Sequence, residues 1–151
     1  MGLINFIKEA GGKLFGQDEK EVVDHGLNAN VLSKHINALG FDVESLSISV
    51  DDDKVSVYGK VQKQEDAEKI ALALGNVKGV SKVDNHLKVE KPAPEAKYHT
   101  VQKGDSLSKI SKEVYGDPMK YKTIFEANKP MLKDPDLIYP GQVLRIPPLG
   151  Q

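Results

Sequence analysis

Side chains able to perform acid–base, nucleophilic or metal chemistry are scattered through this 151-residue chain. Cysteine is absent, which excludes thiolate zinc sites, cysteine nucleophiles and a disulfide framework. The four histidines, His25, His35, His86 and His99, include no His-x-x-x-His pair suited to a metal. No Gly-x-Ser-x-Gly turn or phosphate-binding glycine loop occurs either. We therefore expect a protein without enzymatic activity.

The remaining polar clusters have simple structural explanations. Ser106 stands where a helix should begin, so its hydroxyl is expected to cap that helix. Glu65, Asp66 and Glu68 are expected near a helix N-terminus, where negative charge is favourable. Three aspartates at 51–53 could hold Ca²⁺ or Mg²⁺, but their spacing is not that of a calcium loop. A solvated hairpin turn is the preferred interpretation of these aspartates.

Composition narrows the class of protein further. The net charge of −1 argues against a general nucleic-acid binder, which should present a strongly basic face. No apolar run approaches the ~20 residues that span a bilayer, so membrane insertion is not expected. The apolar fraction of 39% is sufficient for compact cores. We expect a folded chain, and we expect it to be a monomer.

The charge divides the chain into two unequal halves. Residues 1–90 carry a net charge of −4 and residues 91–151 a net charge of +3. The break coincides with residues 91–97, where two prolines in seven residues disfavour both helix and strand. This segment therefore predicts a short linker between two small domains.

The N-terminal segment has helical periodicity. Leu3, Phe6, Ile7, Ala10 and Leu14 recur at the spacing of one helix face, before and after a glycine pair that should loosen the helix. We expect this amphipathic helix to pack on the first domain, with a membrane-surface anchor as the alternative. A secretory signal pattern is not present, so a cytoplasmic location is expected.

The first domain shows the pattern helix, two strands, helix, strand. Helical spacing covers 28–39 and 64–74, and strand-like alternation covers 46–50, 55–61 and 80–89. Residues 55–61 read VSVYGKV and residues 77–89 read VKGVSKVDNHLKV. These motifs resemble a BON domain over about residues 22–90. The resemblance implies a non-enzymatic α-β-β-α-β module.

The second domain carries two further motifs. Residues 98–111 read YHTVQKGDSLSKIS and residues 138–147 read IYPGQVLRIP. They resemble the opening and closing segments of a LysM domain, with Leu107, Ile110 and Val114 facing the core. A second helix is expected over about 118–127, ended by Asn128. The resemblance implies a β-α-α-β fold.

The predicted architecture is thus α+β, in five segments. These are 1–21 (N-terminal helix and connector), 22–90 (BON domain), 91–97 (linker), 98–147 (LysM domain) and 148–151 (tail).

The chain has a BON-like region followed by a LysM-like region. Before the first stand Met1-Gly2-Leu3, Asn5-Phe6, Lys8 and Ala10-Gly11, and residues 125–133 within the second read FEANKPMLK. Together these features resemble a two-domain BON–LysM family of bacterial potassium-binding proteins. The resemblance implies cytoplasmic K⁺ binding, as sensor or buffer, with selectivity over Na⁺ and a more compact shape when K⁺ is bound. Potassium is large and weakly hydrated, so backbone carbonyls can replace its water shell. Such a site would leave almost no side-chain motif.

Free carbonyls are expected where helices end, because the last turn leaves them unpaired and the helix dipole favours cations. Two expected helix ends that contain glycine, at residues 7–12 and 74–80, could supply such carbonyls. The alternative is that water molecules cap these carbonyls. We predict K⁺ coordination by the carbonyls of Ile7, Ala10 and Gly12 at the first end and of Gly75, Val77 and Val80 at the second.

Two alternative functions remain open. LysM domains typically hold N-acetylglucosamine chains, such as peptidoglycan, in a shallow groove. Carried over by resemblance, that groove would involve Gly104, Asp105, Ser106, Leu107, Asp134 and Ile138. The third possibility is a protein-interaction adaptor whose stability does not depend on K⁺.

Overall fold

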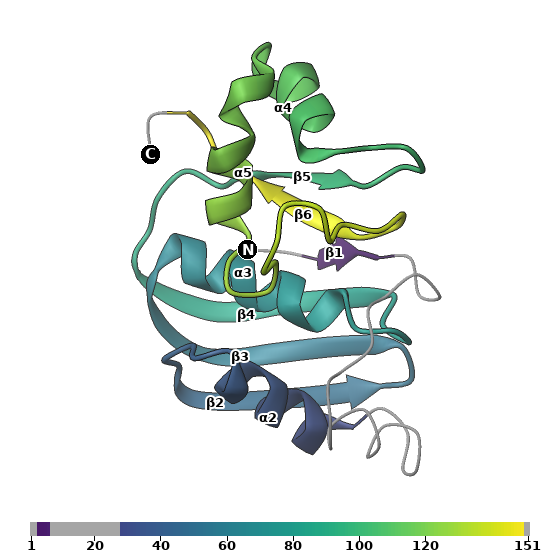
Figure 1. Cartoon of the computed structure of the whole chain (residues 1–151). Coiled ribbons are helices and arrows are strands. Elements are labelled where there is room, and N and C mark those ends of the chain that lie inside the picture. Colours follow the sequence, from purple (N-terminus) through teal and green to yellow (C-terminus); the bar gives the residue numbers. More distant parts are fainter. Residues whose placement is uncertain (1–2, 7–27, 150–151) are drawn as a thin grey trace.

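The computed structural model describes residues 3–6 and 28–149 (Figure 1). Helices and strands both occur, which confirms the predicted α+β class. In chain order the elements are β1 (Leu3–Asn5), α2 (Ala29–Ala38), β2 (Glu44–Asp51), β3 (Lys54–Lys63), α3 (Gln64–Gly75), β4 (Lys82–Lys91), β5 (Lys97–Thr100), α4 (Leu107–Tyr115), the 3-10 helix η2 (Pro118–Lys120), α5 (Tyr121–Ala127) and β6 (Val143–Ile146).

The first domain is a four-stranded sheet in the order β1-β4-β3-β2, with α2 and α3 on one face (Figure 1). Strands β3 and β4 are parallel because α3 carries the chain back across the sheet. Val55, Val57 and Val83 are fully buried under the helices. The side chains that alternate with them along β3 and β4 are partly or fully exposed. The predicted order of two helices and three strands is confirmed for this domain.

The predicted N-terminal helix is wrong for its first residues. Leu3–Asn5 is a strand that pairs antiparallel with β4, and Ile4 lies opposite Val83. The free edge of β4 supplies backbone partners, and this tertiary pairing overrides a short helical periodicity. The rest of the predicted helix lies outside the described residues.

The second domain pairs β5 with β6 and packs α4, η2 and α5 beside them, as the β-α-α-β pattern predicts. The Ser106 hydroxyl accepts a hydrogen bond from the Lys109 amide at 3.2 Å, which confirms the predicted helix cap. Val114 is 39% exposed, so its predicted place in the core is wrong. The core instead takes Leu107, Ile110 and residues from α5 and β6.

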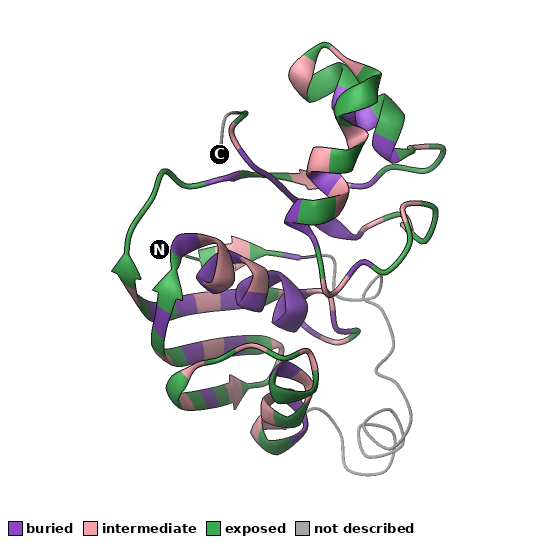
Figure 2. Cartoon of the chain, turned by 60° about the vertical axis from the view of Figure 1, so that its left-hand side comes forward, coloured by how far each residue is buried: buried purple, intermediate pink, exposed green. Residues whose placement is uncertain are grey.

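The two domains touch along α3 and β6 (Figure 1). Val143 of β6 is buried within the core of the first domain, and Met131 packs against the same cluster. Residues 92–96 between β4 and β5 have no regular structure, and most of them are exposed (Figure 2). The contact therefore depends mainly on α3, β6 and the loop that precedes β6, with buried Ala96 as the part of the linker that takes part.

Candidate cation site

The turn between α3 and β4 contains three of the six carbonyls predicted to hold a cation. After Gly75 the chain winds tightly, with the Val77 amide 3.4 Å from the Leu74 carbonyl and the Val80 amide 3.2 Å from the Val77 carbonyl. Gly79 takes φ = +103°, which a side chain would disfavour. The turn thus gathers Gly75, Val77 and Val80 at the negative end of the α3 dipole.

These three residues are buried, although their neighbours Asn76 and Gly79 are part-buried and Lys78 is exposed. Gly75 is buried, Val77 is 4% exposed and Val80 is fully buried. Within the described residues no N–H donates to the carbonyls of Gly75 and Val80, and the carbonyl of Val77 has one of its two lone pairs occupied. A carbonyl of a buried residue without a donor needs another partner, and a cation or a water molecule can supply it.

The N-terminal strand is anchored against this turn. The Phe6 amide donates to the Ser81 carbonyl at 2.8 Å. A Cβ atom on Gly75 would lie only 1.9 Å from Cζ of the Phe6 ring, so glycine is required there by close packing. Ile7, Ala10 and Gly12 lie outside the described residues, so their part in the site stays a prediction. Phe6, the last described residue before them, packs against Gly75 of the turn.

Asn76 lies between two of the candidate carbonyls and binds the second domain. Its Nδ2 donates to the Val143 carbonyl at 2.9 Å, and its Oδ1 accepts from the Val143 amide at 3.0 Å. The Tyr139 hydroxyl donates to the Asn76 carbonyl at 3.4 Å. The turn is therefore fixed from the LysM side as well as from β1.

One turn from the start of α3, Glu68 forms a buried ion pair between the domains. Its Oε1 accepts from Arg145 Nε at 2.8 Å, and its Oε2 accepts from the Ala96 amide at 3.0 Å and from Gln64 Nε2 at 3.5 Å. Glu68 lies near the N-terminus of α3 as predicted, but it is 1% exposed and forms an ion pair with Arg145, which the sequence did not predict. Arg145 is the single arginine of a lysine-rich chain, which is the signal that sequence reasoning missed.

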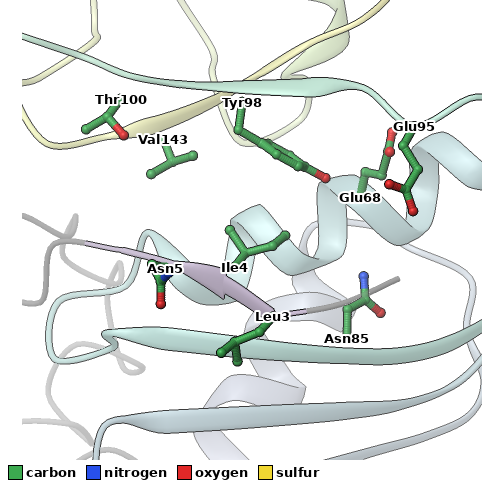
Figure 3. Close-up of a pocket in the computed structure, with 9 residues that line it drawn as sticks. All are labelled: Leu3, Ile4, Asn5, Glu68, Asn85, Glu95, Tyr98, Thr100 and Val143. Carbon is green, nitrogen blue, oxygen red and sulfur yellow. The ribbon is translucent and has the colours of Figure 1, made fainter.

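A cavity of about 440 Å³ lies beside this ion pair, between β1 and the second domain (Figure 3). Figure 3 shows the Tyr98 ring across the cavity with its hydroxyl toward Glu68. Burial raises the pKa of the Tyr98 phenol well above its usual range, and the charge of Glu68 raises it further. Tyr98 therefore stays protonated and keeps a hydroxyl donor on the Glu68 side.

The residues predicted for a glycan groove occupy different environments. Gly104 takes φ = +89°, and Gly104 and Ser106 are exposed in the loop before α4. Leu107 is buried in the domain core, so it does not offer a sugar-binding surface. Asp134 is exposed and Ile138 is half-buried against that core. These residues remain a prediction as a groove.

Asp105, the remaining residue of that prediction, is held within its own loop. Its Oδ2 accepts from the Gln102 amide at 2.9 Å and contacts His99 Nε2 at 3.0 Å. These hydrogen bonds, the backbone one foremost, lower the pKa of the Asp105 carboxyl. Asp105 thus ties β5 to the start of α4.

The rival site at residues 51–53 forms the predicted hairpin turn. Asp51 pairs with Lys54, and Asp52 adopts a positive φ of 54°. The backbone carbonyl of Asp53 accepts from the Ser81 amide at 2.9 Å. In the part of the chain that the structure describes, no group of three or more acidic, histidine or cysteine side chains could hold a metal. Nor does any described helix have the length and apolarity to span a membrane.

Comparison with known proteins agrees with this architecture. The BON domain family matches residues 24–91 and the LysM domain family matches residues 99–147. The potassium binding protein Kbp of Escherichia coli O6:H1 (strain CFT073) is 47% identical over 152 residues, covering 97% of this chain and 99% of that protein. The chain belongs to the Kbp family. Both predicted domain resemblances are confirmed.

Two other relatives share less of their length with this Kbp family member. An uncharacterized protein of Deinococcus radiodurans is 49% identical over 87 residues, which cover 50% of this chain and 33% of that protein. The endolysin of Bacillus phage B103 is 33% identical over 90 residues, 60% of this chain and 31% of the endolysin. BON and LysM are themselves binding domains without catalytic machinery.

Proposed function

We propose that this chain is a cytoplasmic, monomeric K⁺-binding protein that serves as a K⁺ sensor or buffer. The observation that carries the proposal is the α3–β4 turn, in which the buried residues Gly75 and Val80 have carbonyls without donors among the described residues. The relative named potassium binding protein Kbp, aligned over nearly the whole chain, supports K⁺ as the ion.

The chemistry of the turn favours K⁺ over the common divalent cations. Ca²⁺ and Mg²⁺ prefer charged carboxylate oxygens, whereas the turn offers neutral backbone carbonyls. A ring of carbonyls can replace the weak hydration shell of K⁺, and the end of the α3 dipole adds a favourable field. Ile7, Ala10 and Gly12 would complete the ring, because they follow closely in sequence on Phe6, whose ring packs against Gly75.

Binding would also draw the two domains together. Ordering the carbonyls of Gly75 and Val77 fixes the residue between them, Asn76, whose amide holds Val143 of the LysM domain. Ion binding and domain contact are then coupled, and the coupling must be reciprocal. A decrease in the radius of gyration with K⁺ in solution scattering would accompany binding, and an unchanged profile would remove compaction from the proposal.

Isothermal titration with KCl and NaCl tests the ion directly. The expected result is saturable heat with KCl and much weaker heat with NaCl at the same ionic strength. Equal heats, or none, would contradict K⁺ binding. Deletion of residues 1–12 should abolish the KCl heat if the N-terminal carbonyls take part.

Glycan binding through the LysM domain is the second candidate, favoured by the family match over residues 99–147. Gly104 and Ser106 are exposed and accessible to a sugar chain. Retention on peptidoglycan or chitin oligomers, reduced in a Ser106→Trp variant, would support this candidate. Full recovery in the unbound fraction would contradict it.

A further inference from the structure

A second cleft lies where the start of α3, the β4–β5 linker and α5 meet. Its volume is about 710 Å³, within the range typical of small-molecule sites. Both domains and the linker contribute walls, through Lys63, Lys91, Pro94, Lys122 and Arg145. In Figure 1 the linker rises from the end of β4 on the side where α3 begins.

Arg145 lines this cleft, and only part of its guanidinium group is hydrogen-bonded to the described residues. The residue is only 4% exposed, and its Nε binds Glu68. Among the described residues no acceptor meets its two Nη groups. No described side-chain nitrogen is both fully enclosed and unbonded, so these amino groups reach the solvent of the cleft. A largely buried arginine whose Nη groups meet no acceptor among the described residues is suited to bind an acceptor that a ligand supplies.

Two lysines of the cleft also favour an anionic ligand. Lys91 and Lys122 are exposed and have no ion-pair partner within the described ranges. The two carboxylates at the rim are already paired, Glu65 with Lys63 at 3.9 Å and Glu126 with a lysine outside the lining at 2.9 Å. The uncompensated charge that faces the cleft is therefore positive.

We propose that this cleft binds a small anionic ligand that carries a phosphate group. The paired Nη groups of Arg145 match two oxygens of a phosphate, and Lys91 and Lys122 add charge-assisted hydrogen bonds. The ligand would touch the linker and both domains, so it would hold them in the contact seen here. This site is separate from the proposed K⁺ site and does not depend on it.

The test is isothermal titration of the full chain with sodium pyrophosphate at fixed KCl and ionic strength. The double variant Lys91→Gln/Lys122→Gln removes two cleft charges without breaking a contact, and its thermal midpoint without ligand should match that of the wild type. Lys60→Gln/Lys88→Gln is the matched control, since both lysines are exposed on adjacent strands of the sheet. We expect about tenfold weaker binding in the cleft variant and less than about twofold change in the control.

Titrations with inorganic phosphate and with a nucleoside 5′-diphosphate distinguish the sources of the phosphate group. Tighter binding of the nucleotide would indicate a phosphorylated organic ligand, and tighter binding of the inorganic anions would indicate free phosphate or pyrophosphate. The proposal is overturned if none of the three binds saturably. It is also overturned if both double variants weaken binding equally, since that pattern reports general charge screening.

Discussion

Asn76 and Val143 are 67 positions apart and form a two-point hydrogen-bonded pair, one bond of 2.9 Å and one of 3.0 Å. The side-chain amide of Asn76 forms the two hydrogen bonds that a neighbouring strand would form with Val143. It thereby joins the α3–β4 turn to β6. The pair connects the proposed ion site with the LysM domain through one residue.

Asn76→Ala should weaken this connection. Both bonding groups of Val143 lose their partner at a part-buried position, which costs about 1–3 kcal/mol. We expect a lower thermal midpoint and, in addition, a smaller rise in the midpoint on adding KCl. Lys78→Ala, in the same turn but exposed, is the control and should change neither quantity. An Asn76→Ala protein with an undiminished KCl response would show that the pair does not support the ion site.

Gly75→Ala should disturb the contact with the N-terminal strand. The added methyl group would overlap the Phe6 ring, which must move, and overpacking of this kind typically costs about 1–3 kcal/mol. Urea unfolding should show this loss together with weaker K⁺ binding. In a Phe6→Ala background the same substitution should cost much less, since the ring is gone. Equal costs in both backgrounds would contradict the packing seen here.

Glu68→Gln should be among the most destabilising polar substitutions in the chain. It leaves the buried Arg145 guanidinium without its counter-charge, and removal of one partner of a buried pair costs about 3–5 kcal/mol. The exposed pair between Lys63 and Glu65 supplies a control, because Glu65→Gln should cost less than about 1 kcal/mol. A Glu68→Gln/Arg145→Met double variant should recover part of the loss. Similar unfolding midpoints for the Glu68 and Glu65 variants would contradict the role of the buried pair.

The LysM domain should lose stability in acid through Asp105. Its folded-state pKa lies below the ordinary 3.8, so its contribution is present above that value and is lost as the pH falls through the folded pKa. Thermal unfolding of the wild type between about pH 5 and pH 2 should show this loss. Asp105→Asn should flatten that part of the profile. An unchanged acid dependence in the variant would exclude Asp105 as its source.

Local pattern was enough to predict most elements, because strand alternation and helix spacing report which face is buried. Val55 and Val57, or Ile110 and Ile124, were predictable for that reason. Strand β1 was not, since three residues have no periodicity of their own and pair only because β4 offers an edge. The Glu68–Arg145 contact spans 77 positions and depends on how the two domains meet, which no local pattern reports.

The candidate site was predictable only in kind. Glycines at helix ends indicate free carbonyls, and no described N–H donates to the carbonyls of Gly75 and Val80, while their binding of an ion stays a prediction. The role of Asn76 was not predictable, since an amide in a turn usually bonds to its own backbone. Its partner, Val143, becomes evident only from the contact between the domains.

The most direct test of the central claim is the thermal midpoint of the full chain in KCl, RbCl, NaCl and LiCl at matched ionic strength. A ligand that binds the folded state must raise stability, by about 2.7 kcal/mol when its concentration is 100 times the Kd. The account predicts a clearly higher midpoint in K⁺, approached by Rb⁺, than in Na⁺ or Li⁺. The same midpoint in all four salts would contradict it.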